Sequence, residues 1–204
     1  MTLRGAGLAG WLAARAGLLG LALGLFACSG NSVVDSAIDE HGVPGWVSDG
    51  TSILKDRNDR LFRGVGSAPL LGDLSLQTST ADRRARDEVA RILSSYMEIV
   101  SRDFIASGDA EEVGFTELDV ARQIDSLSRM ELPGVEIVGH WRDQNSRMVY
   151  AIAELNMQQA IEAIGKLESM HRGLQEYIDS EGADIFDRIA RVKAEVQELS
   201  LDEQ

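Results

Sequence analysis

Cys28 is the only cysteine in this chain of 204 residues, and it directly follows an apolar N-terminal segment. Residues 1–15 contain Arg4 and Arg15 and no acid, and residues 16–27 carry no charge. A basic start, a short apolar stretch and a small final residue are the pattern of an export signal. The uncharged run is too short to cross a bilayer, which takes about 20 apolar residues. We therefore expect the segment before Cys28 to take no part in the fold.

The last four residues of this segment, Leu25-Phe26-Ala27-Cys28, resemble the signal of bacterial lipoproteins. The resemblance implies cleavage between Ala27 and Cys28 and acylation of the Cys28 thiol, for example by palmitate. The lipid would then attach the mature chain to a membrane. Ser29, in place of aspartate, implies sorting to the outer membrane if the host is Gram-negative. The alternative is an ordinary cleaved signal that leaves Cys28 as a free thiol.

The chain after the signal is strongly acidic. Without Arg4 and Arg15 it has 18 basic and 33 acidic residues, a formal charge of −15. This charge argues against nucleic-acid binding, which needs clustered Lys and Arg, and against docking on anionic phospholipid through a basic face. With Cys28 acylated, no thiol remains for a disulfide or a cysteine metal site. We expect no cofactor and no metal apart from the lipid on Cys28.

The pattern of charge and periodicity predicts four parts: a signal at 1–27, a polar tether at 28–42, an α+β domain at 43–164 and a helical C-terminal arm at 165–204. The domain starts with Val43-Pro44-Gly45-Trp46-Val47, which we expect to be extended because proline disfavours helix. Trp46 is expected to make the first core contact.

Leu61–Ala68 is predicted to be a strand in which Gly64 and Gly66 lie on the same face. A helix is expected to pack closely over this bare face. The glycines are not a dinucleotide fingerprint, because Pro69 follows instead of a third glycine and a helix. An amphipathic helix is predicted over Thr78–Ala106, with its N-cap among residues 78–80 and Gly108 at its end.

A second, shorter helix is predicted from Phe115 to about Met130, with Thr116 as N-cap. Val135–Leu155 predicts a hairpin in which Val135, Ile137 and Trp141 share one face. Its second strand is apolar on both faces, which favours a central place in the sheet. The predicted fold class is α+β: a small antiparallel sheet packed by a long helix, with a helical C-terminal arm.

The helical pattern resumes at Met157 and continues past Gly182 for nearly fifty residues, more than a small sheet needs to cover it. The surplus apolar stripe is expected to pack either on its own first half or on another copy of the chain. The predicted partner surface consists of Leu174, Ile178, Phe186, Ile189, Val192 and Val196.

The order of these elements resembles the LPP-twenty family of small bacterial outer-membrane lipoproteins, which includes flagellum-associated members. The similar segments lie within Val43–Ala163 and include Pro44–Val47, Gly64–Ala68 and Met148–Ala153. The resemblance implies an α+β domain that self-associates and has no assigned catalytic activity. The arm beyond Gly165 is not part of the family pattern.

Few residues point to chemistry. His41, His140 and His171 have no ligand-like spacing, so structural histidines are favoured over a metal ligand or a general base. The acids of residues 109–119 lack the alternating ligands and central glycine of a calcium loop. We expect residues 109–112 to be a solvated acidic loop, and we name no catalytic residue.

The sequence therefore predicts a non-catalytic, lipid-anchored envelope protein that binds or assembles at the membrane surface, with copies of itself or with another envelope protein. One alternative is a binding module for a small envelope ligand, a peptidoglycan fragment or lipid, held between sheet and helix beside Gly64 and Gly66. The other is a cell-wall hydrolase that uses His140 or the acidic loop.

Overall fold

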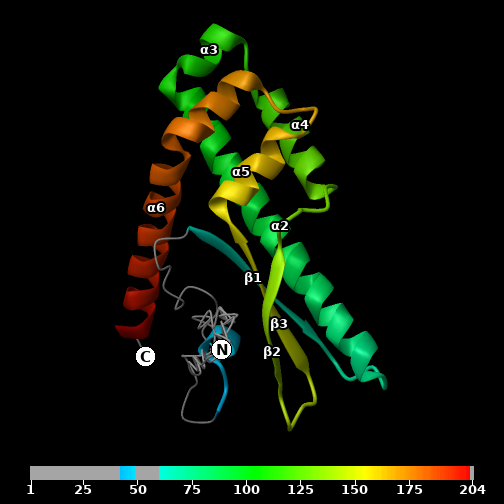
Figure 1. Cartoon of the computed structure of the whole chain (residues 1–204). Helices are drawn as coiled ribbons and strands as arrows, with labels where there is room; N and C mark the ends of the chain where they lie inside the picture. The colour runs from blue at the N-terminus through cyan, green and yellow to red at the C-terminus, as the bar shows by residue number, and fades with distance from the viewer. Residues whose placement is uncertain (1–41, 49–59, 203–204) are drawn as a thin grey trace, which may run out of the picture. The chain divides into compact units, whose positions relative to one another are not determined.

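A small antiparallel sheet and a long helix that crosses it organise the domain (Figure 1). The computed structural model describes residues 42–48 and 60–202, all within one unit, Asn31–Gln204. The signal, Cys28 and the tether up to residue 41 lie outside the described residues. The elements are α1 (Gly45–Ser48), β1 (Leu61–Ala68), α2 (Leu74–Ser107), α3 (Asp109–Val113), α4 (Glu117–Ser128), β2 (Glu136–Arg142), β3 (Val149–Asn156), α5 (Met157–Gly165) and α6 (Arg172–Asp202).

The strand order is β1-β3-β2, and both pairings are antiparallel. β3 is central, as its two apolar faces predicted, and it pairs with β1 from Leu61 opposite Asn156 to Ala68 opposite Val149. The predicted α+β fold class is confirmed.

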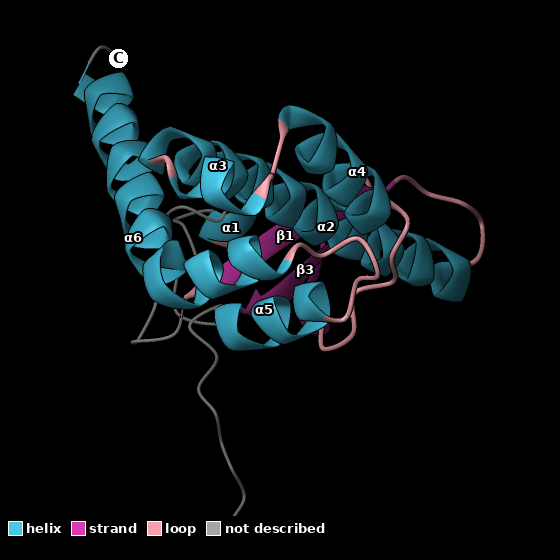
Figure 2. Ribbon diagram, turned by 90° about the horizontal axis from the view of Figure 1, so that it is seen from above, coloured by secondary structure: helices cyan, strands magenta, loops and turns pink. Residues whose placement is uncertain are grey.

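The helix α2 lies directly on the bare face of β1 (Figure 2). A Cβ atom added at Gly64 would lie 2.5 Å from the Ala85 carbonyl oxygen, and one at Gly66 would lie 2.2 Å from the Ala85 nitrogen. The facing helix residues Ala81 and Ala85 are fully buried. The close helix–strand packing predicted from the two glycines is confirmed.

The ends of α2 follow from its caps. The helix begins at Leu74, earlier than predicted, because the Asp73 carboxylate accepts a hydrogen bond from the Leu76 N–H at 3.1 Å. The Thr80 hydroxyl instead donates to the Leu76 carbonyl within the helix, at 2.7 Å. Gly108 ends the helix with a left-handed φ of 91°, as predicted.

Two short segments differ from the prediction. Gly45–Ser48 is a helical turn and not extended, because Pro44 precedes the turn, where its missing N–H costs nothing. The Pro44 carbonyl accepts from the Val47 N–H at 2.8 Å. Asp109–Val113 is a short helix and not a loop, and its acidic first turn complements the helix dipole.

A bulge in β2 changes which residues share a face. Ile137 lies opposite Ala153, but Gly139 lies opposite Ile152, so the register shifts between them. Ile137 therefore packs with the main core under α2, whereas Trp141 packs on the opposite face of the sheet. The prediction that Ile137 and Trp141 share one face is wrong.

That opposite face carries a second, smaller cluster. Trp46 is buried there and packs with the fully buried Ile152, which confirms its predicted core role. The Trp141 and Tyr150 rings lie at the edge of this cluster, with their centroids 5.6 Å apart.

The helix α6 is continuous through Gly173 and Gly182, and its first half joins the main core. Leu174, Ile178 and Ile185 are buried, and the Tyr96 hydroxyl donates to the Gly182 carbonyl at 2.8 Å. The first half of the predicted arm thus packs in the same core as the α+β domain.

Candidate interaction surfaces

The predicted partner surface on α6 runs from buried positions near the start of the helix to the exposed Val192. Leu174 and Ile178 are buried in the chain's own core, so placing them on a partner surface is wrong. Phe186 and Ile189 are partly buried and pack against that core.

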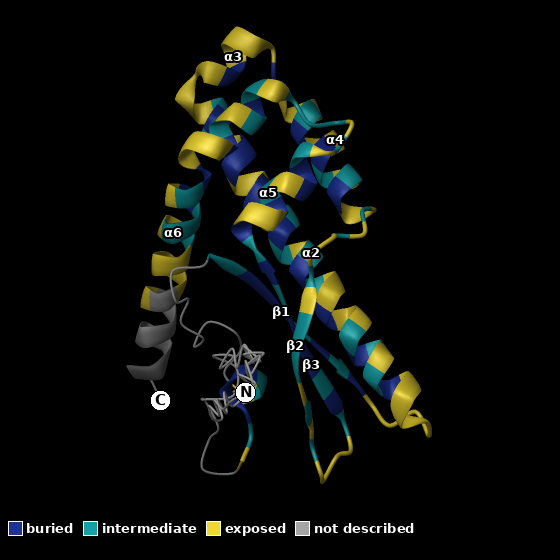
Figure 3. Cartoon of the chain, in the orientation of Figure 1, coloured by how far each residue is buried: buried dark blue, intermediate teal, exposed yellow. Residues whose placement is uncertain are grey.

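Coverage of the stripe ends after Ile189, and Val192 on the next turn is 56% exposed. Figure 3 colours each part of α6 by how far it is buried. The side chain of Val196 lies outside the described part of the helix. We call the segment from Val192 to Asp202 the distal half of α6.

A second exposed apolar surface, which the sequence analysis does not predict, lies where β1 is joined to α2. We call residues 69–76, which are the connection and the first turn of α2, the leucine loop. Of the eight exposed large apolar side chains in the described residues, four belong to this loop: Leu70, Leu71, Leu74 and Leu76. They are between 43% and 55% exposed. Four leucines in seven residues around a glycine were the available signal.

The leucine loop is held firmly at its base. Gln77, the next residue, is fully buried. Its Nε2 donates to the Ala68 carbonyl at 3.0 Å and to the Arg147 carbonyl at 2.7 Å. These bonds tie the start of α2 to the end of β1 and to the β2–β3 turn, so the leucines project from an ordered base.

The side chain of His140 has a hydrogen-bond partner. Its Nε2 lies 2.5 Å from the Asp82 Oδ1 on α2. The β2 bulge turns it toward this helix, whereas the regular alternation predicted the opposite face. The contact with Asp82 is consistent with the structural role predicted for His140.

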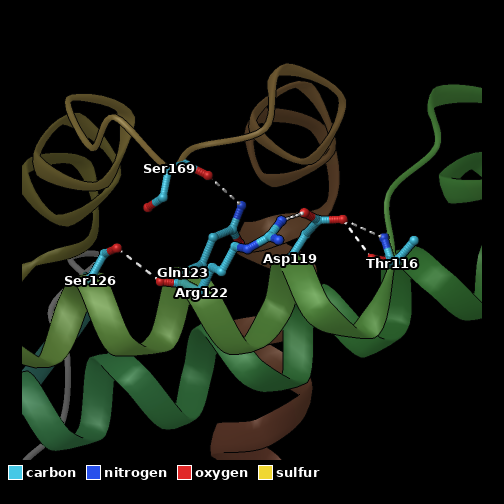
Figure 4. Close-up of polar contacts among 6 residues, drawn as sticks. All are labelled: Thr116, Asp119, Arg122, Gln123, Ser126 and Ser169. Carbon is cyan, nitrogen blue, oxygen red and sulfur yellow. Dashed lines mark hydrogen bonds and ion pairs between the residues drawn. The ribbon is translucent and has the colours of Figure 1, made fainter.

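The acidic residues near α4 serve the helix start (Figure 4). The Asp119 carboxylate accepts from the Thr116 N–H at 2.9 Å and from the Thr116 hydroxyl at 2.7 Å, and it pairs with Arg122 at 3.0 Å. These bonds hold the pKa of Asp119 below its ordinary value. Thr116 is the N-cap of α4, as predicted, and Asp119 completes a capping box with it. Within the described residues, no group of three His, Asp or Glu side chains is placed to hold a metal ion.

A buried amide joins α4 to the connection before α6. Gln123 is 1% exposed, and its Nε2 donates to the Ser169 carbonyl at 3.4 Å (Figure 4). Because this bond links two backbone segments far apart in sequence, we assign Gln123 to the packing of the domain.

One of the two alternative sites, the ligand site between sheet and helix, does not form as predicted. The backbone of α2 fills the space beside Gly64 and Gly66, so the ligand site expected there is wrong. His140 contacts Asp82 near the start of α2, and the acidic residues begin at Asp109, after its end. At 1.5 Å per helical residue the two groups are about 40 Å apart. The hydrolase alternative was predicted to use either of them alone, so it stays a prediction.

No protein-family model matches this sequence, and no curated protein is significantly similar to it. Among the described helices, none combines the length and the apolar character needed to cross a bilayer.

Proposed function

We propose that this chain is a lipid-anchored envelope protein, held at a membrane through Cys28, whose domain has a non-catalytic role in assembly. The outer membrane is the proposed location, and copies of the same chain are the proposed partners. The LPP-twenty resemblance suggests the same role.

The exposure of Val192, where the distal half of α6 begins, is the observation on which this proposal depends. The apolar stripe of this helix is covered by the core up to Ile189 and exposed at Val192. In sequence the stripe continues at the same three- and four-residue spacing to Val196 and Leu199. A stripe with this spacing packs well against the same stripe of a second helix.

Charge on the same helix is compatible with pairing of two copies. The exposed positions next to Val192 carry both signs, with Arg191 and Lys193 basic and Glu195 acidic. Mixed charges beside an apolar seam allow antiparallel or parallel copies to form interhelical ion pairs. A hydrophobic seam would therefore supply affinity, and the flanking charges would set the orientation.

The anchor is tested by the mass of the protein purified from membranes. We expect an N-terminus at Cys28 that carries acyl chains, and uptake of a palmitate analogue during growth. Cys28→Ser should remove the label, and Ser32→Ala, in the tether, should keep it. A mature N-terminus at another residue, or an unmodified Cys28 thiol, would contradict the anchor.

A further inference from the structure

The leucine loop exposes apolar surface on a well-ordered base. Leu70, Leu71, Leu74 and Leu76 are each about half exposed, and Asp73, the single charged residue among them, caps the Leu76 N–H. The carboxylate is thus partly satisfied by the backbone. Such clustered apolar exposure marks an interaction site.

The charge around the loop differs from that of the whole chain. Five arginines and three aspartates lie in residues 69–86, which contain the loop and the start of α2, and in residues 142–148, which contain the β2–β3 turn. The whole chain, in contrast, has a formal net charge of −13. The arginines are Arg83, Arg84, Arg86, Arg142 and Arg147, and all are exposed. Asp73 accepts a hydrogen bond from the Leu76 N–H, and Asp82 contacts His140. This end of the domain therefore suits an anionic surface, against the expectation from net charge alone.

The loop also lies within reach of the proposed anchor. Residues 29–41 separate Cys28 from the first described residue and span at most about 47 Å when extended. Trp46 packs on Ile152, and Ile152 lies opposite Val65 in the sheet. The leucine loop starts four residues after Val65, which is about 13 Å further along the strand. A chain anchored through Cys28 can place this loop on the same membrane.

We propose that the leucine loop inserts into the surface of a phospholipid bilayer and that the flanking arginines contact anionic headgroups. Leucine side chains lose their contact with water in the acyl region, and arginines reach the phosphates from longer stems. The loop would fix the orientation of the domain on the membrane, which a lipid on a polar tether does not do. The proposal rests on the proposed membrane location but not on self-association.

Vesicle binding by the unlipidated polypeptide Ser29–Gln204 separates the loop from the anchor. This polypeptide contains every core residue described above, so it retains the fold. We expect it to bind vesicles of phosphatidylethanolamine and phosphatidylglycerol, and to bind neutral vesicles more weakly. Leu70→Ser with Leu71→Ser should weaken binding by about tenfold. Val113→Ser with Leu118→Ser, at the opposite end of α2, should leave binding unchanged.

A site-specific dye gives a second readout. The polypeptide lacks cysteine, so Leu71→Cys can carry a single polarity-sensitive fluorophore, and Leu118→Cys is the control, at a residue 59% exposed. We expect a blue shift on adding vesicles at position 71 and none at 118. Absence of vesicle binding, or equal shifts at both positions, would overturn the proposal. A concentration-dependent shift at position 71 without vesicles would also overturn it, because the loop would then be a protein interface. Equal binding to anionic and neutral vesicles would overturn the role of the arginines.

Discussion

The two halves of α6 share one apolar pattern but have different surroundings. In the first half, Leu174, Ile178 and Ile185 are buried in the main core, whereas Val192 in the second half is largely exposed (Figure 3). The helix itself is continuous across Gly182. Helical periodicity identifies the apolar face, but only tertiary packing determines which stretch of it is covered.

Polar contacts reinforce this difference. The first half is bonded to α2 through Tyr177, whose hydroxyl donates to Asp103 at 2.9 Å, and through the Gly182 carbonyl, which accepts from Tyr96. Burial and the Asp103 carboxylate raise the pKa of Tyr177 to about 12. These bonds fix the depth and the rotation of the first half against the core.

Replacing apolar residues of the α6 stripe by alanine should give the largest loss of stability. The loss should differ sharply between the two halves of the helix. Leu174→Ala removes a fully buried side chain and should lower the free energy of unfolding by about 2–5 kcal/mol. Val192→Ala should change it by no more than about 0.5 kcal/mol in dilute solution. Urea unfolding of both variants makes the comparison. Equal losses would mean that the distal half also packs on its own domain.

Gly182, in the first half of α6, tests how closely this half packs on α2. A Cβ added there would lie 2.8 Å from the Tyr96 hydroxyl oxygen. Gly182→Ala should therefore destabilise the protein by about 1–2 kcal/mol, although alanine favours helix over glycine. Tyr96→Phe removes that oxygen. The double variant should therefore lose less free energy of unfolding than the two single variants lose together. Strict additivity in a thermal unfolding cycle would rule out this close contact.

The smallest effect is expected at the Arg60–Asp187 ion pair, which joins α6 to the residue before β1. Two hydrogen bonds, at 2.9 and 2.8 Å, hold the pKa of Asp187 below its ordinary value. A carboxyl group whose pKa is lower in the folded than in the unfolded protein stabilises the fold at pH values above its unfolded-state pKa. This contribution is lost as the pH falls through the folded-state pKa.

Because both side chains are more than a third exposed, Asp187→Asn should cost less than about 1 kcal/mol at pH 7. The cost should shrink as the pH falls through the lowered folded-state pKa of Asp187. Asp179→Asn, on the exposed side of the same helix, is the control. A cost as large at pH 2.5 as at pH 7 in urea unfolding would argue against the ion pair.

Much of the fold could be predicted because its signals are local. The spaced glycines of β1, the stripe of α2 and the two apolar faces of β3 each follow from side-chain periodicity. The bulge beside Val138 could not be predicted, because one extra residue in a strand leaves the alternation on either side intact. It also turned His140 toward Asp82.

The interaction surfaces were only partly predictable. The stripe of α6 was evident, but the burial of Leu174 depends on residues distant in sequence. The exposure of the leucine loop could not be predicted, because four leucines in a sequence do not show whether the fold covers them. Its exposure results from the way Gln77 and Asp73 fold the chain into α2.

Light-scattering mass of the Ser29–Gln204 polypeptide over a concentration series tests the central claim, self-association through the distal half of α6, most directly. We predict a defined multimer that Val192→Glu converts to a monomer, whereas Leu118→Glu, at an exposed position on α4, leaves it assembled. A monomer at every concentration, or a multimer that Val192→Glu does not change, would contradict the claim.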